Sequence, residues 1–167
     1  PLTACGVDDT TKYLVSEMGA RAPGQLRWLV SLVPPTVAAV LNVGTAHLGE
    51  FGSRQGIAQA KGEIIEDLGA DDWAVLNADD PLVRGQAAGL PASIIWITHD
   101  PENPTVAAHL HAGGAAVLSE DGWLVIAAGG ERTRVLPLAD IPVTYGGRAR
   151  HMIENVLCAT GAAVALE

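Results

Sequence analysis

Aromatic residues are scarce in this chain of 167 residues, of which they make up only 4%. Small residues are frequent instead, and 49% of the chain is hydrophobic. This composition excludes an intrinsically disordered chain, which combines low hydrophobicity with high net charge. It is typical of a domain in which small residues let helices pack closely on a sheet, and the length is enough for one domain with a buried core.

Positive charge is scarce as well, since 10 basic residues face 19 acidic ones and the net charge is −9. No stripe of Lys and Arg occurs, so we expect no nucleic-acid partner. No hydrophobic run approaches the roughly 20 residues of a membrane helix, so we expect no membrane span. The only cysteines, Cys5 and Cys158, lie far apart in the sequence. They indicate reduced thiols in a cytoplasmic protein, not a disulfide framework.

Lysine occurs only twice, at Lys12 and Lys61, and neither residue follows a glycine. The sequence therefore lacks the Gly-Lys-Thr or Gly-Lys-Ser ending of a phosphate-binding loop. If this acidic chain handles phosphates, the positive charge has to come from metal ions, helix N-termini or another segment.

The hydrophobic pattern predicts alternating strands and helices. Continuous apolar runs predict buried strands at Tyr13–Met18, Val37–Val43, Trp73–Asn77 and Ser93–Thr98. Helices are expected at Gln25–Val33, from the N-cap Ser53 to about Leu68, after Asp79-Asp80-Pro81, and at His151–Leu166. Strands that alternate with helices in this way indicate a parallel sheet.

The pattern changes in the second half of the chain. Short antiparallel strands are predicted at Ala115–Ser119, Trp123–Ala127 and Thr133–Leu136, with a hairpin turn at Glu120–Asp121–Gly122. The expected fold class is therefore α/β. We predict a three-layer domain with a mostly parallel sheet and a small antiparallel hairpin insertion.

Four polar residues lie where such a fold places a ligand site. Glu17 and Asn77 end predicted strands, His47 lies in the loop after a strand, and Lys61 lies in the helix that follows. Ligands of open α/β sheets bind outside the carboxyl ends of the strands. By position alone, an ordinary loop or surface role is the favoured explanation for each of these residues. The pair Asp79-Asp80 has two interpretations, metal binding or the favoured one, a helix start.

The segment Leu41–Ile65 (LNVGTAHLGEFGSRQGIAQAKGEII) resembles the Mur ligases, which build the peptide stem of peptidoglycan. The segments Tyr13–Gly24 (YLVSEMGARAPG) and Ala74–Pro81 (AVLNADDP) resemble the same family. The resemblance covers nearly the whole chain and implies the central, ATP-binding domain of that family. It is strongest to the branch that adds D-alanyl-D-alanine to the UDP-N-acetylmuramoyl tripeptide, and it implies these two substrates.

The resemblance also implies a chemistry and a set of site residues. ATP phosphorylates the substrate carboxylate, and an amine then attacks the acyl phosphate, with Mg²⁺ neutralising the crowded charge. Glu17 and His47 would each ligate a magnesium ion. Lys61 matches the lysine that family members carbamylate, a change that turns a cation into an anionic oxygen donor for magnesium.

The C-terminal part of the chain points to a related enzyme. In Tyr145–Ala159 (YGGRARHMIENVLCA), Asn155 matches the second asparagine of a His-Asn-x-x-Asn pattern that contacts adenine, whereas Met152 stands where the first is expected. This tail is similar to cyanophycin synthetase, which adds arginine to a poly-aspartate backbone by the same acyl-phosphate chemistry. A non-catalytic nucleotide-binding relative is the third alternative.

The domain expected over residues 1–167 is incomplete. The phosphate-binding loop of the family would precede Pro1, and further N- and C-terminal domains of the same protein would complete the enzyme. We therefore expect the isolated chain not to turn over.

Overall fold

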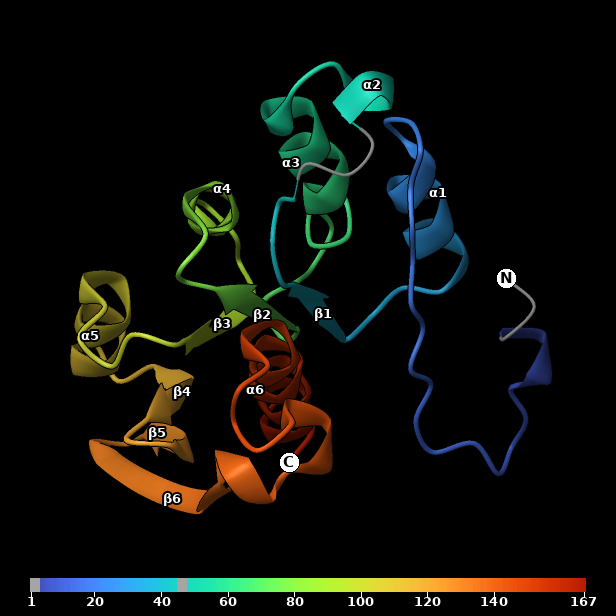
Figure 1. Ribbon diagram of the computed structural model, residues 1–167. Helices are drawn as coiled ribbons and strands as arrows, with labels where there is room; N and C mark the ends of the chain where they lie inside the picture. The colour runs from blue at the N-terminus through green and yellow to red at the C-terminus, as the bar shows by residue number, and fades with distance from the viewer. Residues whose placement is uncertain (1–3, 45–47) are drawn as a thin grey trace.

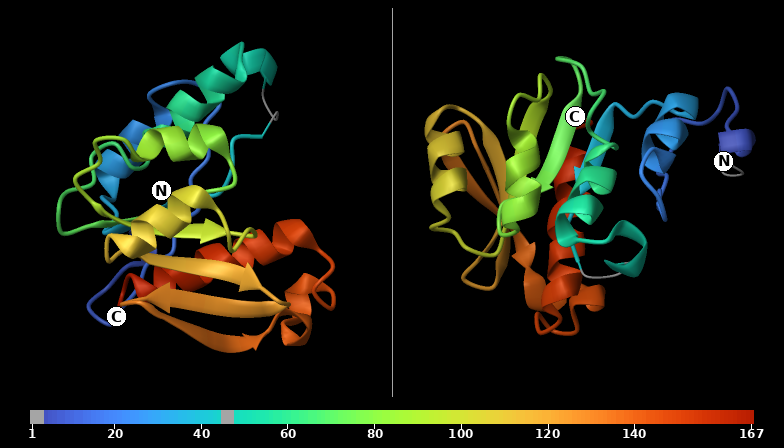
Figure 2. Two further views of the ribbon diagram at one scale, coloured as in Figure 1. Left: turned by 90° about the vertical axis from the view of Figure 1, so that its left-hand side faces the viewer. Right: turned by 90° about the horizontal axis from the view of Figure 1, so that it is seen from above.

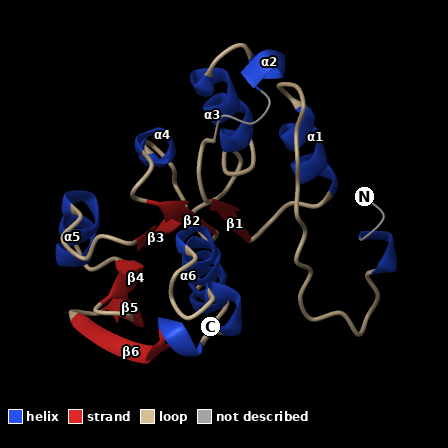
Figure 3. Cartoon of the chain, in the orientation of Figure 1, coloured by secondary structure: helices blue, strands red, loops and turns tan. Residues whose placement is uncertain are grey.

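The computed structural model describes residues 4–44 and 48–167 and contains a six-stranded sheet in which every strand pairs with its neighbour in the sequence (Figures 1 and 3). The strands are β1 (Val37–Val40), β2 (Trp73–Asn77), β3 (Ser93–Thr98), β4 (Ala115–Glu120), β5 (Trp123–Ala128) and β6 (Glu131–Pro137). Strands β1 to β4 are parallel, and β5 and β6 are antiparallel to their neighbours. The predicted α/β class with a mostly parallel sheet is confirmed.

Continuous apolar runs form the centre of the sheet because both of its faces are covered. The run WAVLN forms β2 and the run SIIWIT forms β3, with the bounds expected from the sequence. Val75, Leu76 and Ile95 have no solvent exposure at all. Strand β1 is shorter than predicted and ends at Val40.

Helices cover both faces of the sheet and make three layers (Figures 1 and 2). The α-helices are α1 (Gln25–Leu32), α2 (Leu48–Phe51), α3 (Arg54–Gly62), α4 (Pro81–Arg84), α5 (Pro104–His111) and α6 (Arg150–Val164). Short 3-10 helices occur at Ala4–Gly6, Gly85–Ala87, Leu138–Asp140 and Pro142–Thr144. Helices α3, α4 and α5 pack on one face, and α6 alone packs across β1 to β4 on the other. The sheet therefore separates two hydrophobic cores.

The antiparallel strands continue the main sheet. The β4–β5 turn at Asp121 and Gly122 has positive φ at both residues, 52° and 78°. Positive φ at both central residues defines the two-residue hairpin turn whose twist matches paired strands. The predicted antiparallel element is confirmed, and because β4 also pairs with β3, it continues the main sheet (Figure 2).

The predicted strand at Tyr13–Met18 is wrong. The segment is extended but forms no strand, and the side chains of Tyr13 and Val15 are 67% and 91% exposed. A strand requires a neighbour with which to exchange main-chain hydrogen bonds. None of the six strands pairs with this segment among the described residues, so it lacks such a neighbour.

Helices α1 and α6 end within two residues of the prediction, whereas α3 is clearly shorter than predicted and α5 was missed. Helix α3 begins after its N-cap Ser53 as expected but ends at Gly62, and tighter turns carry the chain to Leu68. Helix α5 was not predicted, although its start has a clear signal. The Asn103 side chain accepts a hydrogen bond from the Thr105 amide, and Pro104 occupies the first helical position.

Glu63 directly follows α3, and its side-chain contacts yield a stability prediction. Its buried carboxylate accepts hydrogen bonds from the Gly24 amide at 2.6 Å and the Arg27 amide at 3.2 Å, at the N-terminus of α1. Helix α1 has no side-chain cap of its own. We therefore expect Glu63→Ala to lower the free energy of unfolding by about 1–3 kcal/mol, because it leaves two partly buried amides at the start of α1 without their acceptor.

Urea denaturation would measure this change, with Glu66→Gln as the matched control. Glu66 pairs with Arg27 on the surface, where both side chains are about half exposed. Its loss is therefore expected to cost less than about 1 kcal/mol. Equal losses in the two variants would contradict the capping role of Glu63.

No helix among the described residues is both long and apolar enough to cross a membrane.

Candidate functional site

Two adjacent carboxylates connect the carboxyl ends of three strands. The Asp80 carboxylate accepts a hydrogen bond from the Val43 amide, just beyond β1, at 2.7 Å. The Asp79 carboxylate accepts hydrogen bonds from the Thr98 hydroxyl at 2.5 Å and from the His99 amide at 2.8 Å, at the end of β3. Both aspartates follow β2, so the sheet edge where the fold class places ligands is held together by this pair.

The structure supports the helix-start role of Asp79-Asp80. The second Asp80 oxygen accepts a hydrogen bond from the Leu82 amide at 2.9 Å and caps α4. Each carboxylate oxygen of the pair is therefore engaged by a donor of the protein itself. Carboxylates that already accept hydrogen bonds from the protein are suited to holding in place the loops that follow β1 and β3.

Lys61 lies at the same edge, in the last turn of α3. Its ammonium donates a hydrogen bond to the main-chain oxygen of Asn42 at 2.7 Å. Burial lowers the pKa of Lys61, and the nearby Asp80 carboxylate opposes that shift. The amine therefore loses its proton more readily than the amine of an exposed lysine does.

The other predicted metal ligands do not join Lys61 in a described cluster. Glu17 is exposed in the extended segment before α1, and His47 lies outside the described residues. Within residues 4–44 and 48–167, no group of three His, Cys, Asp or Glu side chains is placed to hold a metal ion. The described part of the chain is thus not a complete magnesium site, and the three assignments stay predictions.

The two predicted nucleotide contacts differ in accessibility. Asn77 ends β2 as expected, but its side chain is only 3% exposed and accepts a hydrogen bond from the Asp79 amide at 2.8 Å. This contact shapes the turn that carries the aspartate pair. Asn155 is exposed on α6, so its amide is free to meet a ligand apart from a weak contact with the Met152 sulfur at 3.7 Å.

His99 connects β3 to the first turns of α6. Its Nε2 atom is buried 3.5 Å from the Glu154 carboxylate, in a geometry that gives it no hydrogen-bond partner among the described residues. The Arg150 guanidinium lies 4.0 Å from the same carboxylate. Burial lowers the pKa of His99, with Arg150 adding to the shift, while Glu154 and Asp79 oppose it.

This shift predicts a pH dependence of stability. His99 takes up its proton less readily when folded than when unfolded, so acidification favours the unfolded chain. The stability present above about pH 6.5, the ordinary histidine pKa, is therefore lost as the pH falls through the lower pKa of the folded state. We expect His99→Gln to flatten the decline in unfolding free energy between pH 7.5 and 5.5, as measured by urea denaturation. The exposed His111→Gln is the control and should keep the wild-type slope; an unchanged slope in His99→Gln would refute this origin.

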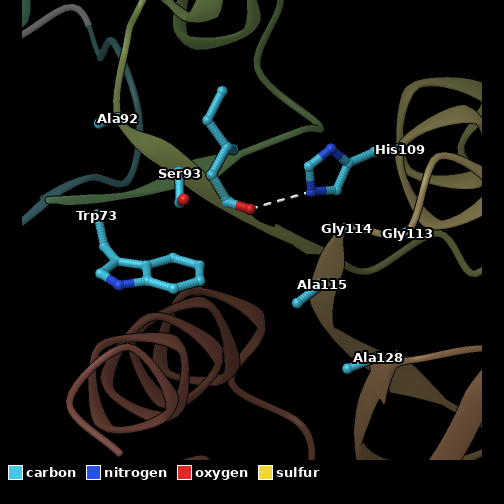
Figure 4. Close-up of a pocket in the computed structure, with 9 residues that line it drawn as sticks. Trp73, Ala92, Ser93, His109, Gly113, Gly114, Ala115 and Ala128 are labelled. Carbon is cyan, nitrogen blue, oxygen red and sulfur yellow. Dashed lines mark hydrogen bonds between the residues drawn. The ribbon is translucent and has the colours of Figure 1, made fainter. Parts of the chain in front are cut away.

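A pocket of about 390 Å³ lies at the opposite edge of the sheet, where β2, β3 and β4 begin (Figure 4). The ring of His109 closes one side by contacting the Ile94 main-chain oxygen at 3.0 Å through Nε2. Gly114 is required beside it, since a Cβ at that position would lie 2.1 Å from the same nitrogen. The ring thus serves the packing of α5, and the pocket lies apart from Lys61.

Sequence reasoning identified Asp80 only as part of a helix start, and it missed Arg54 and His99 as residues that organise this edge. The Arg54 guanidinium donates a hydrogen bond to the Val43 main-chain oxygen at 3.0 Å, next to the amide that Asp80 binds. The signal for Asp80 was present, because an Asp-Asp-Pro string directly follows a buried strand. Arg54 and His99 carry no such signal, since their partners lie 11 and 55 residues away.

Comparison with known proteins shows which proteins this chain is similar to. The Mur ligase middle domain matches residues 2–163. The UDP-N-acetylmuramoyl-tripeptide–D-alanyl-D-alanine ligase of Mycobacterium bovis is 38% identical over all 167 residues, which correspond to 30% of that protein. Cyanophycin synthetase of Geminocystis herdmanii is 40% identical over 158 residues, which are 93% of this chain and 18% of that protein. The chain therefore spans less than a third of the length of these curated relatives.

A solved structure shows the same fold. A crystal structure of MurF from Acinetobacter baumannii matches 96% of this chain and 32% of its own, with a TM-score of 0.67 and 26% sequence identity. The family model covers nearly the whole chain, and the Mycobacterium bovis ligase is similar to this chain over all of the chain's 167 residues. This chain belongs to the Mur ligase middle-domain family.

Proposed function

We propose that this chain is the ATP-binding part of an amide ligase that joins D-alanyl-D-alanine to the UDP-N-acetylmuramoyl tripeptide. The observation that carries the proposal is the 38% identity, over every residue of this chain, to a relative named for that reaction. Because the chain spans 30% of that relative, the activity belongs to a longer protein with further N- and C-terminal domains. The cytoplasm is its proposed location, since its substrates and ATP are found there.

The reaction requires activation of a carboxylate, which is a poor electrophile. A carboxylate oxygen attacks the γ-phosphorus of ATP, and ADP leaves. The amine then attacks the acyl carbon, loses a proton, and inorganic phosphate departs. Catalysis of such transfers consists mainly of positioning and of charge stabilisation. Bound magnesium would supply part of the charge stabilisation by neutralising the negative charge of the phosphates.

The residues assigned to this work are those at the carboxyl edge of the sheet and on α6. Lys61, carbamylated, together with Glu17 and His47 would hold magnesium. Asn155 would contact adenine from α6, where its exposure leaves it available. Asn77 would line the nucleotide site indirectly, through the turn that its side chain stabilises.

A second candidate is a cyanophycin-synthetase-like ligase. The specific observation in its favour is the 40% identity to a cyanophycin synthetase over 93% of this chain. The two candidates use the same activation chemistry and differ in the amine and the acceptor.

The test supplies the full-length protein with ATP, magnesium and each substrate pair in turn, and measures phosphate release and product mass. The proposal expects phosphate release only with the muramoyl tripeptide and D-alanyl-D-alanine together. Release with arginine and a poly-aspartate acceptor would establish the second candidate. Nucleotide binding without phosphate release in either mixture would leave a non-catalytic relative as the correct description.

A further inference from the structure

The main chain at Asn42 and Val43 is held by side chains from three separate places. Lys61 binds the Asn42 oxygen at 2.7 Å, Arg54 binds the Val43 oxygen at 3.0 Å, and Asp80 binds the Val43 amide at 2.7 Å. Arg54 and Lys61 lie at the two ends of α3, and Asp80 precedes α4. Two residues of backbone are thus clamped from both sides, directly where the chain leaves β1.

Asp80 performs two separate tasks with its two oxygens. One oxygen accepts a hydrogen bond from the Leu82 amide and so caps α4. The other oxygen accepts a hydrogen bond from the Val43 amide. Only a carboxylate can do both, because the side-chain amide of asparagine has a single acceptor oxygen. Replacing Asp80 with asparagine therefore preserves a good helix cap and sacrifices the bond to Val43.

We infer that Asp80 is a positioning residue for the ligation reaction, which acts by fixing the Asn42–Val43 backbone. That backbone provides the oxygen against which Lys61 is held, and it precedes the segment with His47 by four residues. Asp80 thereby sets the position of Lys61 without contacting substrate. The inference rests on the proposed function, in which carbamylated Lys61 would help to hold magnesium.

The experiment compares the full-length protein with its Asp80→Asn and Asp72→Asn variants. Asp80→Asn is expected to lower kcat about 10- to 100-fold, the loss typical of a catalytic group displaced by up to about an ångström. The KM for ATP should stay within about twofold, since uniform binding is unaffected. Asp72 also accepts a main-chain amide, from Gly69 at 2.7 Å, but at the other edge of the sheet. Its variant should retain the wild-type kcat.

Amide hydrogen exchange provides a second readout that does not depend on activity. In Asp80→Asn, the Val43 amide should exchange at least about tenfold faster, while that of the buried Leu76 in β2 stays protected. Arg54→Gln loosens the same backbone without touching the α4 cap, and it should lower kcat in the same direction. If Asp80→Asn does not fold, Arg54→Gln alone tests whether the Asn42–Val43 backbone positions Lys61 for catalysis.

The outcomes separate the inference from the proposed function. A wild-type protein that forms no product contradicts the proposed function, and the exchange data then report only on the clamp. An active wild-type protein whose Asp80→Asn and Arg54→Gln variants keep full kcat overturns the inference alone. A fall in kcat with unchanged Val43 exchange overturns it as well, because Asp80 would then act by another route.

Discussion

Replacing Lys61 with arginine is expected to lower kcat for ligation by about 100-fold or more in the full-length protein, the scale seen when one preorganised charge-stabilising group is lost. Arginine keeps the positive charge and the helix propensity of lysine. Its guanidinium stays protonated and planar, however, so it cannot react with carbon dioxide to give a carbamate. A lysine that served only as a cation would tolerate this change much better.

The matched control for Lys61→Arg is Lys12→Arg, which changes the only other lysine of the chain. Lys12 is exposed before α1, and its variant should keep wild-type kcat. Carbon-13 NMR with labelled bicarbonate would show a carbamate signal that Lys12→Arg retains and Lys61→Arg loses. Full activity of Lys61→Arg would exclude the carbamate mechanism.

Leu157→Ala is expected to lower the free energy of unfolding by about 2–5 kcal/mol, the range for a large aliphatic side chain removed from a packed core. Leu157 is fully buried on α6, in the core that this helix forms with one face of the sheet. Val75 and Ile95 of that face are also without exposure, and strands cannot move inward to fill the space.

Urea denaturation would measure the loss, with Leu166→Ala as the control. Leu166 lies just beyond the same helix, and its side chain is 48% exposed. The same truncation there should change stability by less than about 0.5 kcal/mol. Comparable changes in both variants would mean that α6 is not packed on the sheet as the structure has it.

The central strands and most helices could be predicted because their signals are local. The runs WAVLN and SIIWIT are apolar at every buried position except their last, Asn77 and Thr98, and Ser53 and Asp80 both precede the helices that they cap. Tyr13–Met18 has an equally apolar run and forms no strand. Pairing depends on a neighbouring strand, which local composition does not report. The early end of α3 was missed as well, because the apolar spacing continues to Leu68 although tighter turns replace the helix after Gly62.

The candidate site was predictable only where a motif was present. Lys61 was singled out from the resemblance of Leu41–Ile65, and the structure independently places it against the end of β1. The clamp on Val43 was not predictable in this way. Asp80 and Arg54 reach it from 37 and 11 residues away, and only the folded chain brings these partners together.

The order of the strands has a consequence for how the chain acquires its structure. Each strand pairs with the strand next to it in the sequence, so the sheet can grow by one strand at a time as the polypeptide leaves the ribosome. Helix α6 follows all six strands, yet it packs across β1 to β4. The hydrophobic core on the α6 side of the sheet therefore stays open to water until α6 has been synthesised, and chaperone binding during translation is most valuable in that interval.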